Sequence, residues 1–413
     1  MVLPTNSQSQ SFASSSSSSF NLIKSVTLSR AARESGFEGL FWETYLPNSQ
    51  FSSLFDDTQR ALGGSISVIR EIPSGNNLLR IALGAMALRA AAINNDDPGW
   101  MKQQATKLHV TALQQMRMAL SSHRKHGLEL LGAARVFSLY EALYGGDWRN
   151  QETQSRSWRV HHSGDLALIV SNPPSFYITG PAHRLFVDGR LNHVQCALSE
   201  RKKLVLNEAA WMTIPWSQHR KTRKDFLIDI LLEIPSLYED IDNTILTQPS
   251  QRHNIQKRVS AVIGRLATWN SKFGVTLSSS VQDWRFPVSM STDRIADAHI
   301  MTLYWATSLL AYSLYRDFSE EPDGVSIDAD DCCRSIIHCI PVFLHPSTGA
   351  FRQHLVPFPL MAAALYLKAV QPPKLPTERD YLLSLCENSV FAPMHQFMSS
   401  LRPRILIGLE DNP

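Results

Sequence analysis

The apolar residues of this chain recur at helical spacing over most of its length. The stretch that follows Gly180-Pro181 predicts a helix that runs past Arg190 to Arg201, because a proline preceded by a glycine is a typical helix start and one face beyond it is apolar. The apolar positions of that face lie four, three and four residues apart. They are Val187, Leu191, Val194 and Leu198. Arg190 falls outside this apolar stripe, so we expect it to face elsewhere.

The same reasoning predicts helices on both sides of this one. One helix carries His161, His162 and Leu166, and Trp211 and Trp216 flank Pro215 where another helix breaks. The remaining helices are predicted over 78–88, 105–120, 128–144, 226–238, 255–273, 295–315, 330–343, 359–370 and 378–398. No alternating strand pattern of useful length and no repeat occurs. The expected fold class is therefore all-α, a large domain of antiparallel helices.

Two regions differ from this pattern. Residues 1–25 are rich in serine, including the run 14–19, and we expect a disordered tail, although an acid-poor, serine-rich start is also compatible with a mitochondrial presequence. The helical domain is then expected to span 26–413. Its longest uncharged apolar run, 300–315, is shorter than the roughly 20 residues that a membrane span requires, so it predicts a buried helix and no membrane contact.

Composition narrows the function. The chain has 40 lysines and arginines against 37 aspartates and glutamates, a balance without the strongly basic face of a dedicated nucleic-acid binder. None of its five cysteines precedes Cys196, so the first 195 residues cannot supply the six thiolates of a binuclear zinc cluster. An odd number of cysteines at irregular spacing favours a reducing compartment over a disulfide framework.

The order of residues from 158 to 216 resembles the middle region of fungal-specific transcription factor domains, the regulatory domains that follow a zinc binuclear-cluster module. No single residue is diagnostic, but their joint order is. The matching positions are Trp158, His161, Gly164, Gly180-Pro181, Leu185-Phe186, Arg190, Ala197-Leu198, Arg201-Lys202, Trp211 and Pro215-Trp216. Weaker similarity, including the Phe-Pro-Leu at 358–360, extends the resemblance over roughly 37–370.

The resemblance implies a nuclear, transcription-factor-like regulator of a fungal gene set, such as a secondary-metabolite gene cluster. Lacking the zinc cluster, it would form a homodimer or bind a protein partner, reach DNA only through that partner and respond to a small-molecule effector. The alternative is an enzyme or small-molecule-binding protein of a biosynthetic pathway, built on the same helical fold around an apolar cavity. Under the first hypothesis the protein is not an enzyme and has no catalytic residue, cofactor or metal.

Two clusters carry the chemistry that the alternative would need, and a third, of cysteines, is a candidate thiol sensor. His162 and Asp165 lie three residues apart on one helix face, and His161 is next to them in the sequence. Histidine with a carboxylate can bind a metal or move protons, but consecutive histidines on a helix point about 100° apart, so both cannot easily bind one ion. The favoured interpretation is that these residues are hydrogen-bonded within a helical core. Asp328-Ala329-Asp330-Asp331 spells the acid motif of terpene cyclases, yet acids also favour a helix N-terminus. Cys332, Cys333 and Cys339 fit small apolar packing better than a thiol sensor.

One dense basic segment, residues 220–224, follows Trp216. Such a run can act as a nuclear import signal, but a solvated loop before the next helix is the favoured interpretation. The phosphate-binding loop, the dinucleotide glycine fingerprint, the G-x-S-x-G elbow, H-E-x-x-H and C-x-x-C are all absent from the sequence. Their absence argues against the common hydrolases, oxidoreductases and kinases.

Overall fold

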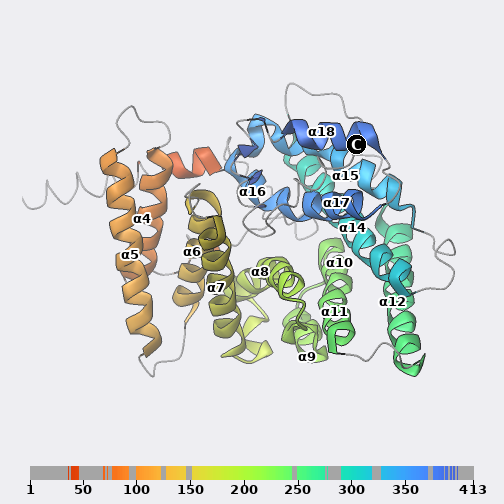
Figure 1. Ribbon diagram of the computed structural model, residues 1–413. Helices are drawn as coiled ribbons and strands as arrows, with labels where there is room; N and C mark the ends of the chain where they lie inside the picture. Colours follow the sequence, from red (N-terminus) through yellow and green to blue (C-terminus); the bar gives the residue numbers. More distant parts are fainter. Residues whose placement is uncertain are drawn as a thin grey trace, which may run out of the picture.

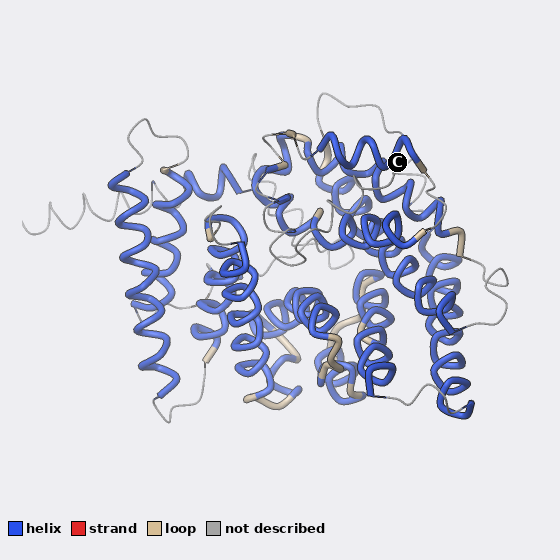
Figure 2. Tube along the Cα trace, viewed as in Figure 1, coloured by secondary structure: helices blue, strands red, loops and turns tan. Residues whose placement is uncertain are grey.

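The computed structural model describes most of the chain and is helical throughout the part it describes. The described residues are 36, 39–45, 68–69, 72, 77–92, 99–121, 127–145, 151–243, 249–274, 277, 290–318, 327–370, 375–385, 387–388, 391–392, 394–395 and 398. Within these ranges every regular element is a helix and no strand occurs (Figure 2), which confirms the all-α prediction. The predicted disordered tail, 1–25, lies outside the described residues.

The helices pack as neighbouring pairs around a central helix (Figure 1). α4 and α5 form a pair at one end, α6 and α7 form the next, α8 crosses the middle, and α14 packs against α12, α15 and α17 on the far side. The helices are α4 (Asn77–Ala91), α5 (Gly99–Ser121), α6 (Leu128–Tyr144), α7 (Gln151–Val170), α8 (Gly180–Glu200), α9 (Ala209–Thr213), α10 (Arg223–Leu231), α11 (Glu233–Asn243), α12 (Pro249–Trp269), α14 (Thr292–Phe318), α15 (Ala329–Leu344), α16 (Arg352–Leu355), α17 (Pro357–Ala369) and α18 (Pro376–Leu385).

The central helix α8 begins and ends as its sequence predicts. Gly180 has a φ of +67°, a conformation that glycine adopts readily, and Pro181 occupies the first turn, where its missing N–H costs nothing. The helix stops at Arg201, which lies in the left-handed region. Ten of the 21 residues of α8 are buried, among them polar ones such as His193. The resembling segment 158–216 therefore lies at the centre of the fold.

Arg190 lies outside the apolar stripe of α8 but does not face solvent. Its side chain is fully buried, because the guanidinium lies between α8 and α10, where it contacts the carboxylates of Asp225 and Asp229. It also lies 4.5 Å from the ring centroid of Trp216, and Lys221 lies over the same ring at 4.4 Å. An apolar stripe in the sequence identifies the apolar side of one helix. It does not identify the charged residues of another helix that pack against the remaining sides.

Two predicted helices are shorter than expected. The single helix predicted over 226–238 is divided into α10 and α11, and Pro235 lies in the first turn of α11, where a proline is tolerated. The helix predicted over 378–398 ends at Leu385. The carbonyl of Asn388 then accepts hydrogen bonds from the N–H groups of Phe391 and Ala392, which starts a separate turn.

The long apolar helix predicted over 300–315 forms part of α14, and its residues belong mainly to the buried core. No helix among the described residues has the length and apolar character to cross a membrane.

Replacing Arg190 with methionine should reduce the free energy of unfolding by about 3–5 kcal/mol, because it leaves Asp225 and Asp229 as buried carboxylates without their guanidinium. Urea denaturation measures the change. The matched control is Arg316→Met, whose partner Asp317 is 55% exposed and whose loss should cost about 1 kcal/mol or less. Equal losses for the two variants would show that the buried contacts of Arg190 contribute no more than a surface ion pair.

Candidate functional site

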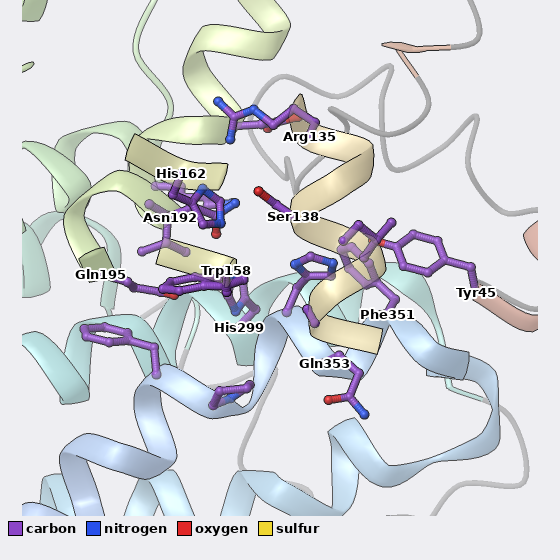
Figure 3. Close-up of a pocket in the computed structure, with 18 residues that line it drawn as sticks. Tyr45, Arg135, Ser138, Trp158, His162, Asn192, Gln195, His299, Phe351 and Gln353 are labelled. Atoms are coloured by element: carbon purple, nitrogen blue, oxygen red, sulfur yellow. The ribbon is translucent and has the colours of Figure 1, made fainter. Parts of the chain in front are cut away.

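A polar cavity lies where α6, α7, α8, α10 and α14 meet the segment around α16 (Figure 3). Its volume is about 60 Å³, which is enough for a few water molecules or a polar group of similar size. Ten lining residues carry polar or charged groups. They are Arg135, Ser138, His162, Asp188, Asn192, Gln195, Lys224, His299, Gln353 and His354.

Several of these residues carry a buried polar atom without a hydrogen bond to the described residues. These atoms are Ser138 Oγ, His162 Nδ1, His299 Nδ1, Gln353 Oε1 and His354 Nε2. In Figure 3 the Ser138 hydroxyl points from α6 toward the side of the cavity that holds His162 and Asn192. A buried polar group that lacks a hydrogen bond costs about 1–3 kcal/mol, so a bound molecule that satisfied several of them would gain affinity.

The charges of the cavity nearly cancel. Burial lowers the pKa of Lys224, and the carboxylates of Asp188 and Asp225 act in the opposite direction. Burial also lowers the pKa of His299 and His354, and the nearby Lys224 lowers both further, so these imidazoles are neutral at pH 7. A neutral imidazole has one donor and one acceptor nitrogen. The cavity therefore suits a neutral, hydrogen-bonding group better than a strongly charged one.

Two further pockets adjoin the polar cavity, because they share lining residues with it or with each other. A second pocket of about 90 Å³ shares Trp158, Gln195, Pro357 and Phe358 with the first. A third, of about 240 Å³, shares Tyr238, Leu310, Ala362 and Leu365 with the second. Together they form a trough with α8 and α11 on one side and α14 and α17 on the other. Its polar end is the cavity, and its middle is apolar.

The wall of the cavity formed by α6 is held by Arg135. Its Nη2 lies 2.8 Å from Oδ2 of Asp165 on α7, and it donates a hydrogen bond of 3.3 Å to the carbonyl of Leu185 on α8. His193 Nε2 lies 3.0 Å from the same Asp165 oxygen. A Cβ at Gly189 would lie 1.6 Å from the guanidinium, so the close approach of α6 and α8 requires glycine there.

The structure keeps His162 and Asp165 together and separates His161 from them. One ligand atom each from His162, Asp165 and His193 lies within 4.8 Å of the others, but Arg135 already neutralises Asp165, and a metal ion there would meet a guanidinium. His161 points away from this group, as the 100° step between consecutive helical residues predicts. It lies instead with His109 and Glu141.

This second group joins three helices. Nε2 of His109 on α5 lies 3.7 Å from Oε1 of Glu141 on α6, and Nε2 of His161 on α7 lies 3.9 Å from the same oxygen. Burial raises the pKa of the Glu141 carboxyl, but the two histidines lower it more, to about 2. Glu141 is therefore a carboxylate at neutral pH.

The acids at 328–331 do not form a cyclase-like site. Asp328 is the N-cap of α15 and accepts a hydrogen bond of 2.9 Å from the Asp331 N–H, while Asp330 accepts one of 2.6 Å from the Tyr366 hydroxyl. None of these acids lines the polar cavity or the trough among the described residues. Their geometry fits the helix-terminus interpretation.

The cysteines of α15 are buried thiols. Cys332, Cys333 and Cys339 all belong to the core, as predicted for small apolar packing. Burial raises the pKa of each, that of Cys333 to about 12, so none is a thiolate at neutral pH. Cys386 lies outside the described residues.

The basic segment 220–224 is not a solvated loop. Lys221 pairs with Asp229, Arg223 Nη2 lies 3.1 Å from Asp297, and Lys224 is buried at the cavity wall. Arg220 is exposed. Carboxylates on neighbouring turns and helices, which a local charge pattern does not reveal, hold the segment against the fold.

Sequence reasoning missed Arg135, His193 and His109, although a signal for each was present. Arg135 and Ser138 occupy the two inner positions of a helical stripe whose outer positions, Leu131 and Ala142, are apolar. The four positions lie four, three and four residues apart. His109 stands between Ala105 and Ala112 in the buried stripe of α5 in the same way. A polar residue in such a stripe is expected to be buried, and most buried polar groups in proteins have a hydrogen-bond partner.

Acid should destabilise the protein partly through His354. Its pKa is about 4 in the folded chain against 6.5 unfolded, so between these values protons bind preferentially to the unfolded chain and stability falls as the pH falls. Between pH 6.5 and 4.5 this histidine should account for a loss of about 2 kcal/mol, measured by urea denaturation at each pH. His354→Gln should remove that part of the pH dependence.

The exposed His253 on α12 supplies the control for this measurement. His253→Gln should keep the pH dependence of the parent protein. An unchanged dependence in His354→Gln would show that His354 is protonated as easily in the folded chain as in the unfolded one.

No protein-family model, curated protein or solved structure matches this chain. The all-α fold therefore stands on the structure, and the resemblance of the central segment stays a prediction. The geometry of the polar cavity is the starting point for function.

Proposed function

We propose that the protein is a transcription-factor-like regulator whose helical domain binds a small amphipathic effector and which reaches DNA through a protein partner. The observation that carries this proposal is the polar cavity and the largely apolar pocket beside it, which share Trp158, Gln195, Pro357 and Phe358. Binding pockets for small molecules combine an apolar lining with a few placed polar groups, and this arrangement has both.

The lining defines the chemistry of the effector. Its polar end carries hydroxyl or carbonyl oxygens, because the cavity offers neutral imidazoles, a serine hydroxyl and amide groups while its charges nearly cancel. The rest of the molecule is apolar, since Leu310, Met361 and Leu365 line the adjoining pocket. Small oxygenated products of secondary metabolism have this character.

Several positions that carry the family resemblance line the same space, which supports the connection between the trough and regulation. Trp158 lies between the polar cavity and the apolar pocket, Leu198 lines that pocket, and Arg201 lines the third. An effector in the trough would contact the central segment directly. It would also contact α14 and α17 opposite, so it could change how these helices pack.

The proposed partner rests on charge. The formal net charge is +3, and three of the four cations of segment 220–224 are engaged within the fold. A second copy of the chain or another protein in the nucleus would therefore supply or complete the DNA contact.

The second candidate function is an enzyme or carrier of a biosynthetic pathway that uses the same cavity. The observation that favours it is a buried lysine of lowered pKa, Lys224, beside neutral histidines that can exchange protons. Both functions predict a ligand in the trough, and they differ in what its binding changes.

Deletion of the gene separates the two functions. Under the first, transcripts of the neighbouring genes should fall together, because the regulator that activates them is gone. Under the second, those transcripts should hold steady while one metabolite accumulates. RNA sequencing and metabolite extraction from the same cultures give both measurements, and a complemented strain is the control.

Ser138→Ala should separate a role in binding from a role in stability. The Ser138 hydroxyl is buried at the cavity and has no hydrogen bond to the described residues. Its removal takes away an unsatisfied polar group, so the melting temperature should stay unchanged or rise slightly. The transcript level of the neighbouring genes should nevertheless fall severalfold. Ser308→Ala, at a buried serine of α14 outside the cavity, should leave transcripts at the parental level. Parental transcript levels in both strains would show that the effector does not bind in this cavity.

A further inference from the structure

A second side-chain group, away from the polar cavity, has the composition of a metal site. His109, Glu141 and His161 come from three successive helices, α5, α6 and α7. One ligand atom from each lies within 4.8 Å of the other two, and both histidines present Nε2 to the same carboxylate oxygen. Two imidazoles and one carboxylate are a ligand set that zinc accepts.

The spacing of the three atoms is wrong for direct hydrogen bonds. The Nε2 to Oε1 distances are 3.7 Å for His109 and 3.9 Å for His161, whereas N–H···O bonds measure about 2.7–3.2 Å. Ligand bonds of about 2.0–2.1 Å around a tetrahedral ion place neighbouring ligand atoms about 3.3 Å apart, so each nitrogen would have to move about 0.5 Å toward the carboxylate oxygen to reach that spacing. His109 Nε2 is buried and has no hydrogen bond to the described residues.

Aromatic contacts hold the imidazole rings in place. The His109 ring stacks on Tyr140 at 4.1 Å and meets the edge of Phe137 at 5.4 Å. The His161 ring packs against the same Phe137, with ring centroids 5.7 Å apart. The backbone carbonyl of Glu141 accepts a hydrogen bond of 3.0 Å from Gln154. Ligands held in this way lose little conformational freedom when they bind an ion.

The charge around the group distinguishes it from the group of His162, Asp165 and His193. Asp165 has a guanidinium 2.8 Å away, which neutralises it. Among the described residues, the ion-pair contacts of Glu141 are with His109 and His161 alone. Imidazoles are neutral in their metal-binding form, so a divalent cation at Glu141 would meet a carboxylate that no described lysine or arginine pairs with.

We propose that His109, Glu141 and His161 bind one Zn²⁺ ion, with water completing the coordination, and that the ion fastens α5 to α6 and α7. The helix α5 needs such a link, because only Met101, Ala105, His109 and Ala112 of its 23 residues are buried. One of those four positions is a ligand. The argument for this site does not depend on the proposed regulatory function, since none of its three residues lines the polar cavity.

Zinc binding to the full-length protein tests this site. After removal of metals with a chelator and dialysis, Zn²⁺ is titrated in competition with a chromophoric chelator, and Co²⁺ is titrated separately as a spectroscopic probe. The expected result is one ion per chain and a higher melting temperature with Zn²⁺. Glu141→Gln, which keeps the size of the side chain, should weaken binding at least about tenfold and abolish the thermal shift.

Matched variants assign the ligands. His109→Ala and His161→Ala should weaken binding as Glu141→Gln does, while His253→Ala, at an exposed position of α12, should bind like the parent. Circular dichroism verifies that each variant keeps its helical content. The proposal is overturned if neither ion binds saturably, if Glu141→Gln binds with parental affinity, or if His193→Gln alone abolishes binding, since that would assign the ion to the other histidine group.

Discussion

The burial of two guanidinium groups against α8 constrains the rest of this fold. Arg135 reaches Asp165 from α6, and Arg190 reaches Asp225 and Asp229 of α10. A buried charge that loses its partner costs several kcal/mol, so α6, α7, α8 and α10 are restricted to positions that keep both contacts. Apolar packing alone tolerates sliding of one helix on another, whereas these ion pairs do not. Gly189 adds to the constraint, because any larger residue would displace Arg135.

The same contacts explain how a polar cavity persists in a helical core. Arg135 belongs both to the ion pair and to the cavity wall, and His162 and Lys224 line the cavity from helices that the two pairs hold. If only apolar contacts held these helices, collapse onto the cavity would bury its polar groups without partners. Because the ion pairs fix the spacing, the polar groups remain available to a ligand or to water.

The sequence predicted the helices better than the contacts between them. A helix is indicated by a pattern within a few residues, whereas a contact depends on residues far apart in the chain. The helix predicted over 128–144 coincides with α6, because its pattern repeats within a few residues. The environment of Arg190 could not be predicted in that way, since Asp225 and Asp229 follow it by more than thirty residues and arrive on another helix. The residues of both candidate sites depend on such distant contacts. The available local signal is a polar residue in an apolar stripe, and it reveals burial but not the partner.

The adjacent histidines on α7 belong to two different side-chain groups. His162 lines the central cavity and His161 joins the group with His109 and Glu141, because successive side chains on a helix point about 100° apart. One rigid helix therefore belongs to both sites. A rotation of α7 that brings His162 closer to a ligand would move His161 relative to Glu141, and an ion held by His161 would resist that rotation. Coupling between the sites would then require no chain of intermediate contacts, because α7 itself is the shared element.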